Sequence, residues 1–411
     1  MSFQSLSGFR DFYPEDCALR EHIFSGWRES SRAFGFSQYD GPPLEPLELY
    51  KKKSGDEIIG QLYNFTDKGG REVALRPELT PTFARLAGAR HRDYKKPLKW
   101  FAIPQLFRYE RAQRGRLREH FQWNGDIVGE PSLSAEAEIL AMIDHALRGL
   151  GLTREDYVIR VSDRQFWLDF LAKHNVTDSG KIYDFLQVLD KIERTPEEVS
   201  REKLGSLSAE VFALLNGGAD SRRLDTLLAA CASLGLSDAV QVDLRIVRGL
   251  AYYTGVVFEV HDRGGKFRAI AGGGRYDNLL QLIADIDLPA VGFGMGDVVI
   301  GEILKDKNLA PKTADGDSYY LVIADETLRP RALALASALR DGGYRVDYPL
   351  SAAKVGRQFQ AAEERGHRYA LFIGQEYADS GVCGLKTLAT REQVNVKPLI
   401  VGGKVTALAD G

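Results

Sequence analysis

The apolar positions in the first 150 residues recur at helical spacing in three segments. Residues 14–35 begin with Pro14, Glu15 and Asp16, which favours a helix start because acidic side chains in the first turn face the positive end of the helix dipole. Residues 79–93 follow the same spacing. Residues 132–151 predict a third helix, with a serine cap at its start and a glycine stop at its end.

Alternating apolar and polar residues predict strands between these helices. Residues 61–76 fit a hairpin with a Lys-Gly-Gly turn, whereas 35–50 fit a loop or a short strand. Residues 98–110 and 116–128 predict an antiparallel pair of longer strands. Because successive residues of a strand point to opposite faces, the polar residues of the second strand share one face. They are Arg116, Arg118, His120, Gln122, Asn124 and Asp126.

The rest of the chain divides by pattern into an inserted subdomain, more strands and a separate domain. Residues 175–235 are helical and rich in charge, strand signal returns at 240–272, and 307–318 has the composition of a linker. Three strands then alternate with two helices, which predicts a small α/β domain. The predicted order is the first part of a large α+β domain at 1–174, a helical insertion at 175–238, the second part at 239–306, a linker at 307–317 and the C-terminal domain at 318–411.

Composition narrows the function classes. The 411 residues carry a net charge of −3, so any nucleic-acid binding must use local patches rather than overall charge. Cys17, Cys231 and Cys383 are far apart, which disfavours a disulfide framework or a zinc site. The chain start lacks the apolar core of a signal peptide, and no apolar run approaches the ~18 residues of a membrane span. We therefore expect a cytoplasmic protein without a membrane segment.

The polar face of the strand pair carries arginine rather than lysine. A solvated face of an antiparallel sheet is the simplest explanation of the alternation. However, arginine presents a planar fork of donors that suits bidentate contacts with phosphate. The cations also cluster at one end of residues 116–127, whereas Gln122, Asn124 and Asp126 lie at the other. This gradient favours a substrate with a phosphate end and an amine end.

The segment FRYERAQRGRLREHFQ, residues 107–122, resembles the second signature motif of class II aminoacyl-tRNA synthetases. The resemblance implies that Arg108 binds the α-phosphate of ATP. It also implies that Glu110 lies near the adenine amino group and that Arg116 lies near the γ-phosphate. Arg111 and Arg114 fall in the connecting loop, where the acceptor end of a tRNA is expected.

Two further segments resemble motifs of the histidyl-tRNA synthetases. IVRGLAYYTGVVFEV, residues 246–260, is similar to the strand that implies a role for Arg248 beside the histidine carboxylate and the α-phosphate. An edge-strand or ion-paired arginine is the alternative interpretation. The same motif places Tyr253 in the side-chain pocket. AGGGRYDNL, residues 271–279, resembles the second histidine motif, in which Tyr276 reaches the imidazole; a glycine turn before a helix is the alternative.

LRPELTPTFARL, residues 75–86, resembles a third segment of that family. The match implies that Glu78 and Thr80 hold the α-amino group, although a proline and an acid also suit a plain helix start. Gln122 and Asp126 lie at the far end of the polar strand and complete the predicted histidine site. A carboxylate against the imidazole would favour a defined tautomer or the protonated ring.

The resemblance covers nearly the whole chain and implies fold, substrates and partners. It implies an antiparallel-sheet catalytic domain of class II with a helical insertion, plus a C-terminal anticodon-binding domain. Lys354 and Arg357 of that domain lie one turn apart on a predicted helix, which suits phosphate contacts. ATP, L-histidine and histidine tRNA are the expected ligands, Mg²⁺ is expected with ATP without assigned ligands, and a homodimer is expected.

Three positions depart from the family pattern. Val299 stands where the third class motif carries an arginine for the γ-phosphate. Either another cation, such as Arg114, Arg116 or Arg118, supplies the missing charge, or the use of ATP is impaired. Ala251 replaces an aspartate of the first histidine motif. Ala112 replaces a loop proline, which bears on recognition of the extra 5′ guanosine of histidine tRNA.

Two other function classes fit part of the pattern. The apolar Val299 favours a non-catalytic regulatory subunit of ATP phosphoribosyltransferase that is built like a synthetase. The C-terminal α/β domain argues against it, because that paralogue generally lacks an anticodon-binding domain. The other alternative is an amino-acid or tRNA-binding paralogue without synthetase activity.

Overall fold

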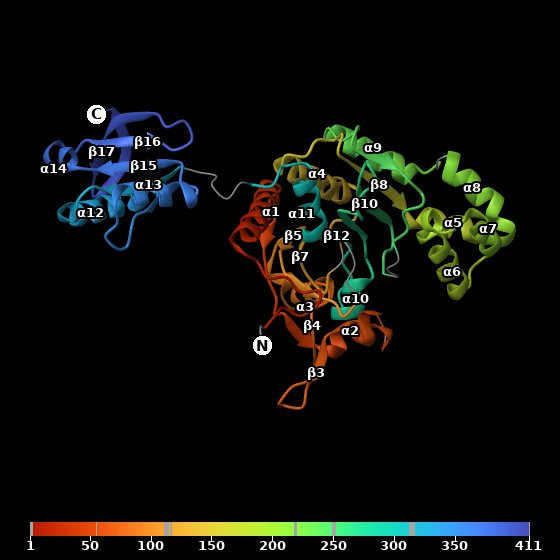
Figure 1. Cartoon of the computed structure of the whole chain (residues 1–411). Helices are drawn as coiled ribbons and strands as arrows, with labels where there is room; N and C mark the ends of the chain where they lie inside the picture. The colour runs from red at the N-terminus through yellow and green to blue at the C-terminus, as the bar shows by residue number, and fades with distance from the viewer. Residues whose placement is uncertain are drawn as a thin grey trace. The chain divides into compact units, whose positions relative to one another are not determined.

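A computed structural model describes residues 3–54, 56–110, 115, 117–217, 220–248, 252–311 and 317–410 (Figure 1). The chain divides into two compact units, Met1–Ala310 and Pro311–Gly411. Helices and strands mix in both, as the predicted α+β class requires. None of the helices in the described part of the chain combines the length and the apolar character that crossing a membrane requires.

The first unit is organised around a large sheet. In the described residues it has nine strands in the order β1-β5-β7-β12-β11-β10-β8-β9, with β6 paired to β7. The central strands are antiparallel, and only the edge pairs β1–β5 and β8–β9 are parallel. The strands are β1 (Ser37–Gln38), β5 (Leu98–Ala102), β6 (Gln105–Phe107), β7 (Glu119–Val128), β8 (Tyr157–Asp163), β9 (Val240–Val242), β10 (Val256–Asp262), β11 (Ala271–Arg275) and β12 (Ala290–Gly296).

Helices cover both faces of this sheet (Figure 1). One face is packed by α1 (Pro14–Ala33), α4 (Ser134–Gly149) and α11 (Asp297–Asp306), around a core that includes the rings of Trp27, Trp123 and Phe293. Side chains of the opposite parity, such as Leu98 and Val257, join a second core with α3 (Thr80–Arg90) and α10 (Leu279–Ala284). The predicted polar strand face points toward this second layer.

A small sheet and a helix precede α3. The sheet has the order β2-β4-β3, with β2 (Leu44–Pro46), β3 (Asn64–Thr66) and β4 (Glu72–Leu75). The strands β3 and β4 confirm the predicted hairpin at 61–76. The region predicted as loop or strand at 35–50 contains β1 and β2, but it ends in α2 (Leu47–Ser54), which packs against α10. A short 3-10 helix, Asp56–Gln61, joins α2 to the hairpin.

The segment after β8 is helical, as predicted (Figure 1). Helices α6, α7 and α8 contact one another in series, whereas α9 packs against α4 and β8. An ion pair between Arg223 of α9 and Asp163, with 2.9 Å between Nε and Oδ2, joins α9 to the end of β8. The helices are α5 (Arg164–Lys173), α6 (Ser179–Asp190), α7 (Glu197–Leu204), α8 (Ser208–Gly217) and α9 (Arg222–Ser233).

The second unit contains the predicted alternation of strands and helices. Its parallel strands are β14, β13 and β15, and three antiparallel strands outside the prediction extend the sheet to the order β14-β13-β15-β16-β17-β18. The elements are β13 (Ser318–Ile323), α12 (Arg329–Asp341), β14 (Arg345–Asp347), α13 (Val355–Glu364), β15 (Tyr369–Ile373), α14 (Gln375–Ser380), β16 (Cys383–Thr387), β17 (Gln393–Val401) and β18 (Lys404–Asp410).

Two local predictions are wrong. The strand predicted at 98–110 is divided into β5 and β6 at Ile103 and Pro104, because proline has no N–H to donate to the ladder. No serine caps α4: its N-cap is Leu133, whose side chain makes no capping bond. The predicted antiparallel pairing of the two strands is confirmed, with Trp100 opposite Asp126.

Candidate active site

A small cavity of about 90 Å³ opens on the polar face of β7. Eight residues that the sequence motifs single out line it together, although they come from four separate segments of the chain. They are Glu78, Thr80, Arg108, Gln122, Asp126, Arg248, Tyr253 and Tyr276. The lining is completed by Asn124, Tyr252, Gly272, Gly292, Phe293 and Gly294. The cavity therefore has the composition of a polar small-molecule site.

Glycines of β11 and β12 make the room for these side chains. A Cβ on Gly272 would lie 1.9 Å from Nη1 of Arg248, and a Cβ on Gly292 would lie 2.0 Å from Oδ1 of Asp126. The strand register explains this, because Gly292 pairs directly with Asp126 across β7 and β12. The glycine run of the second histidine motif is thus needed for close approach rather than for a turn.

One end of the cavity holds a buried acid. The hydroxyl of Tyr276 donates a hydrogen bond to Oδ1 of Asp126, and both side chains are almost fully buried. Burial raises the pKa of Asp126 to about 7, against which the Tyr276 hydrogen bond acts. The pKa of the Tyr276 hydroxyl is itself raised by burial and by the neighbouring carboxylate. This end can accept a hydrogen bond and take up or release a proton near neutral pH.

The opposite side of the cavity holds Arg248 in a fixed position. Nη1 of Arg248 lies 2.7 Å from Oε1 of Glu259, whose other oxygen lies 2.9 Å from Nε2 of His261. Burial favours the neutral form of Glu259, but His261 and Arg248 together lower its pKa below the ordinary value. The backbone of Arg248 is left-handed, with φ of 56°, which a non-glycine residue adopts only when its surroundings impose it. The carbonyl of Arg248 accepts a hydrogen bond from Nη1 of Arg164 at 3.3 Å.

The segment 76–80 completes the wall. Nε of Arg108 donates to the carbonyl of Pro77 at 2.9 Å, which ties the second-motif strand to this segment. Arg76 is buried and donates to the carbonyls of Gly41 at 2.6 Å and Gln105 at 3.0 Å. Its guanidinium therefore links these two segments of the fold. Glu78 and Thr80 follow and face the cavity at the start of α3.

One predicted ATP residue that the structure describes, Glu110, does not line the cavity. Glu110 is half-buried and does not belong to the cavity wall; its carbonyl accepts a hydrogen bond from Nε of Arg118 at 3.0 Å. Arg116 lies outside the described residues, as do Arg111, Ala112, Arg114 and Ala251. The guanidinium of Arg118 lies 4.9 Å from the ring centre of Tyr109, so this group already contacts an aromatic ring as well as the Glu110 carbonyl. Val299 is 7% exposed and belongs to the main apolar core.

Some functional residues escaped the motif comparison. Glu259 of β10 holds the Arg248 guanidinium. It pairs across the sheet with Gly272, the glycine that makes room for that guanidinium. Tyr252 lines the cavity beside the predicted Tyr253. Asn124 belongs to the polar parity of β7, which the alternation indicated. A carboxylate opposite a glycine is a pattern that sequence alone rarely resolves.

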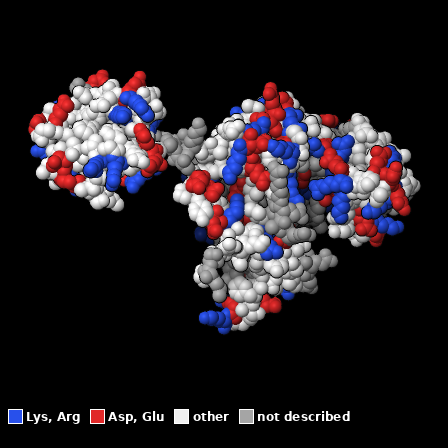
Figure 2. Space-filling view, in the orientation of Figure 1, with Lys and Arg blue, Asp and Glu red and all other residues white. Residues whose placement is uncertain are grey.

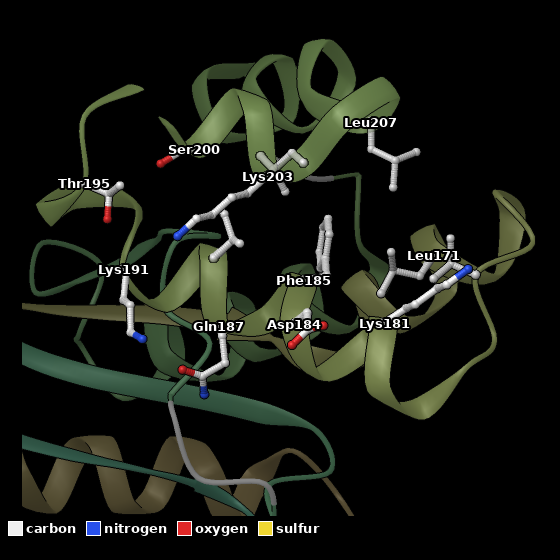
Figure 3. A pocket seen from close by; sticks show the side chains of 13 residues that line it. Leu171, Lys181, Asp184, Phe185, Gln187, Lys191, Thr195, Ser200, Lys203 and Leu207 are labelled. Carbon is white, nitrogen blue, oxygen red and sulfur yellow. The ribbon is translucent and has the colours of Figure 1, made fainter. Parts of the chain in front are cut away.

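A larger cavity lies in the helical insertion. It measures about 590 Å³ between α5, α6 and α7, and Phe185 points into it (Figure 3). Lys181, Lys191 and Lys203 are exposed residues on its wall, and the remaining lining is mostly apolar. None of the predicted site residues that the structure describes lines it. The smaller, more polar cavity on the sheet is therefore the candidate site.

Two family models match the chain. The one described as "Histidyl-tRNA synthetase" matches residues 8–296, and the one described as "Anticodon binding domain" matches residues 314–406. The histidine–tRNA ligase of Opitutus terrae is 45% identical over 420 aligned positions, which cover 96% of each chain. The chloroplastic/mitochondrial histidine–tRNA ligase of Arabidopsis thaliana is 40% identical over 95% of this chain and 84% of its own.

Solved structures share the fold. The histidyl-tRNA synthetase from Nostoc sp. PCC 7120 superposes with a TM-score of 0.85 at 24% identity, covering 97% of both chains. A structure from Bacillus halodurans C, titled as an ATP phosphoribosyltransferase regulatory subunit/histidyl-tRNA synthetase, gives 0.74 at 22% identity, covering 90% of this chain and 98% of its own. At these identities the likeness concerns the fold alone. From the family match over residues 8–296 and the identity to its relatives, the chain belongs to the histidyl-tRNA synthetase family, with a class II catalytic domain followed by an anticodon-binding domain.

Proposed function

We propose that the protein activates L-histidine with ATP and transfers the histidyl group to histidine tRNA. The observation that carries the proposal is the convergence of eight motif residues on one cavity, in a chain 45% identical to a histidine–tRNA ligase. In the first step a carboxylate oxygen of histidine attacks the α-phosphorus of ATP. The bond to the bridging oxygen breaks, and pyrophosphate leaves with the electron pair.

The polarity of the cavity fits the two ends of histidine. The Asp126–Tyr276 pair offers an acceptor for an imidazole N–H at one end. Glu78 and Thr80 offer oxygens for the ammonium group on the wall formed by the start of α3. A histidine bound this way directs its carboxylate toward the arginines.

Arg108 and Arg248 are the cations that line the cavity in the described residues, and both are held by fixed partners. Phosphoryl and adenylyl transfer depend on positioning and on charge stabilisation more than on covalent help. Because Glu259 holds Arg248 at 2.7 Å, the guanidinium is preorganised for the charge that builds on the α-phosphate. Holding the arginine in place before the reaction is what makes such a contact effective.

We propose ATP as a substrate and Mg²⁺ as its counter-ion. In the described residues no group of three or more His, Cys, Asp or Glu side chains could hold a metal ion. Mg²⁺ commonly keeps several waters and relies on phosphate oxygens with one or two carboxylates. The ion would therefore be bound chiefly by the phosphates of ATP, where it would neutralise their charge.

We also propose that the second unit contacts the tRNA, and that the protein acts as a cytoplasmic homodimer. Lys354 is the N-cap residue of α13, and Arg357 lies one turn later on the same helix. The helix N-terminus and two cations suit a phosphate backbone. On the face drawn in Figure 2, cationic side chains of both units are interspersed with acidic ones, so tRNA contacts would be local.

The regulatory-subunit alternative has one observation in its favour, the apolar Val299. The anticodon-binding match at 314–406 and the two ligase relatives outweigh it. The test is ATP–pyrophosphate exchange with each standard amino acid. We expect exchange with histidine well above all others. Exchange with another amino acid, or with none, would refute the proposal and leave the alternative.

A further inference from the structure

The position of the missing third-motif arginine is occupied by an apolar side chain. Val299 lies in the first turn of α11 and packs into the main core. Gly115, in the loop after β6, lies beside it: a Cβ on Gly115 would be 3.7 Å from Cγ2 of Val299. Gly115 directly precedes Arg116, which the motif places near the γ-phosphate. The terminal phosphates of a bound ATP are therefore expected next to Val299.

Another arginine reaches the same point from a different strand pair. The same Cβ on Gly115 would be 3.5 Å from Cδ and 3.9 Å from Cγ of Arg268. Arg268 belongs to the connection between β10 and β11, and it is an exposed residue. Its stem thus passes beside Gly115, the residue that also lies next to Val299, and Arg268 as a whole is exposed to solvent.

The connection that carries Arg268 is fastened along α11. Backbone N–H groups of Lys266 and Phe267 donate to the two oxygens of Asp262, at 2.8 Å and 3.0 Å. The ammonium of Lys266 pairs with Asp306 at the end of α11, and Phe267 packs against the main core. The loop therefore runs beside α11 from its last residue to its first turn. The backbone hydrogen bonds to Asp262 and the packing of Phe267 hold the loop in this position, whereas the solvent-exposed Lys266–Asp306 ion pair adds little to its stability.

A second cation near the start of α11, Arg10, already forms ion pairs with two carboxylates. Arg10 donates from Nε to Glu119 at 2.6 Å and from Nη1 to Asp297 at 2.9 Å. Both carboxylates are buried, so one cation faces two potential negative charges. Arg10 thus stabilises the start of β7 and the start of α11. Because the two carboxylates balance its charge, it would attract a phosphate only weakly.

We infer that Arg268 binds the terminal phosphates of ATP and takes the role of the arginine that Val299 displaces. The inference rests on the proposed function, which sets the direction of the nucleotide from Arg108 toward Gly115. A guanidinium offers two parallel N–H donors to phosphate oxygens and stays charged at any working pH. It would also stabilise the charge that collects on the departing pyrophosphate.

The test compares Arg268→Gln with Arg268→Lys and with the control Lys266→Gln. The control removes a cation from the same loop, but one that already pairs with Asp306. We expect Arg268→Gln to lower kcat/KM for ATP by about 10- to 100-fold in pyrophosphate exchange, the usual weight of a hydrogen-bonded charge, with KM for histidine changed less than about twofold. Arg268→Lys should have a kcat/KM for ATP between those of Arg268→Gln and the wild type. Lys266→Gln should match the wild type.

A second readout separates this inference from the proposed function. ATP affinity measured by calorimetry without histidine should fall in Arg268→Gln even if exchange proves undetectable in the wild type. A wild type that shows no histidine-dependent exchange refutes the proposed function. An Arg268→Gln variant with wild-type ATP affinity and exchange, or one that loses ATP and histidine equally along with thermal stability, refutes the role of Arg268.

Discussion

Asp126→Asn should stabilise the first unit and at the same time impair histidine activation. The carboxylate lies in the cavity at 4% exposure, and burial raises its pKa from 3.8 to about 7. A raised pKa means that the folded state holds the proton more tightly than the unfolded chain does. Ionised Asp126 therefore costs folding free energy, and the cost appears as the pH rises from about 4 to about 7.

The size of that cost follows from the pKa change. At about 1.4 kcal/mol for each pH unit, the rise from 3.8 to about 7 corresponds to at most about 4 kcal/mol above neutral pH. Asparagine is neutral at every pH and keeps a carbonyl oxygen to accept the hydrogen bond from Tyr276. The variant should therefore be more stable than the wild type at pH 8, and the difference should vanish toward pH 4.

Tryptophan fluorescence during urea unfolding measures this difference in the full chain. All four tryptophans, Trp27, Trp100, Trp123 and Trp167, lie in the first unit, so the signal reports only that unit. We expect a higher urea midpoint for Asp126→Asn at pH 8 and similar midpoints near pH 4, with an unchanged slope.

Activity should move in the opposite direction. An amide cannot match a carboxylate as partner for an imidazole N–H, so kcat/KM for histidine should fall by about 10- to 100-fold. Asp285→Asn, at an exposed position after α10 that tolerates asparagine, is the matched control and should change neither midpoint nor activity. A midpoint at pH 8 below that of the wild type would refute the reasoning, because it would mean that the buried charge is not costly.

Three further predictions concern the arginine, a glycine and the second unit. Arg248→Ala should lower histidine-dependent exchange by at least ~10²-fold, as loss of an oxyanion-type contact does; near-normal exchange would remove this residue from the mechanism. Gly272→Ala should cost most of the activity and about 1–3 kcal/mol of stability, because its Cβ would collide with the Arg248 guanidinium, whereas Gly296→Ala, with open space around it, should leave exchange and the urea midpoint unchanged. The double change Lys354→Gln with Arg357→Gln should weaken aminoacylation of tRNA in a salt-dependent way and leave pyrophosphate exchange intact; a parallel loss of both would contradict the separation of roles.

The sequence patterns predicted most of the fold because each element carries a local signal. The hairpin at 61–76 and the alternation after residue 318 were found because their periodicity and turn residues agree. The predicted strand at 98–110 failed at Pro104, where the loss of one N–H outweighs the apolar pattern. The three antiparallel strands β16 to β18 pair over short connections, and their residues, mostly exposed or half-buried, give little alternation to detect.

The sequence predicted candidate site residues that the structure brings together in one cavity, whereas it did not show how these residues support one another. Motif spacing pointed to Arg108 and Arg248, because each motif keeps its residue types at fixed offsets along the chain, and the polar alternation of residues 116–127 pointed to Asp126. Only the strand register showed that Glu259 backs Arg248 and that Gly272 makes room for it. The same holds for Arg268, which lies beside Gly115, as Val299 does, although no motif includes it.

Local order along the chain thus determined which residues are candidates for the chemistry, since propensity, alternation and motif spacing act over a few residues. The tertiary structure decided the protonation, the ion pairs and the position of the charged side chains around the site. Burial raised the pKa of Asp126. Arg10 forms ion pairs with Glu119 and Asp297. The β10–β11 connection placed Arg268 at Gly115, next to which Val299 also lies. The electrostatic interactions and the pKa of a side chain depend on its distance from other charges and on the exclusion of water. Both are set by residues far apart in the sequence.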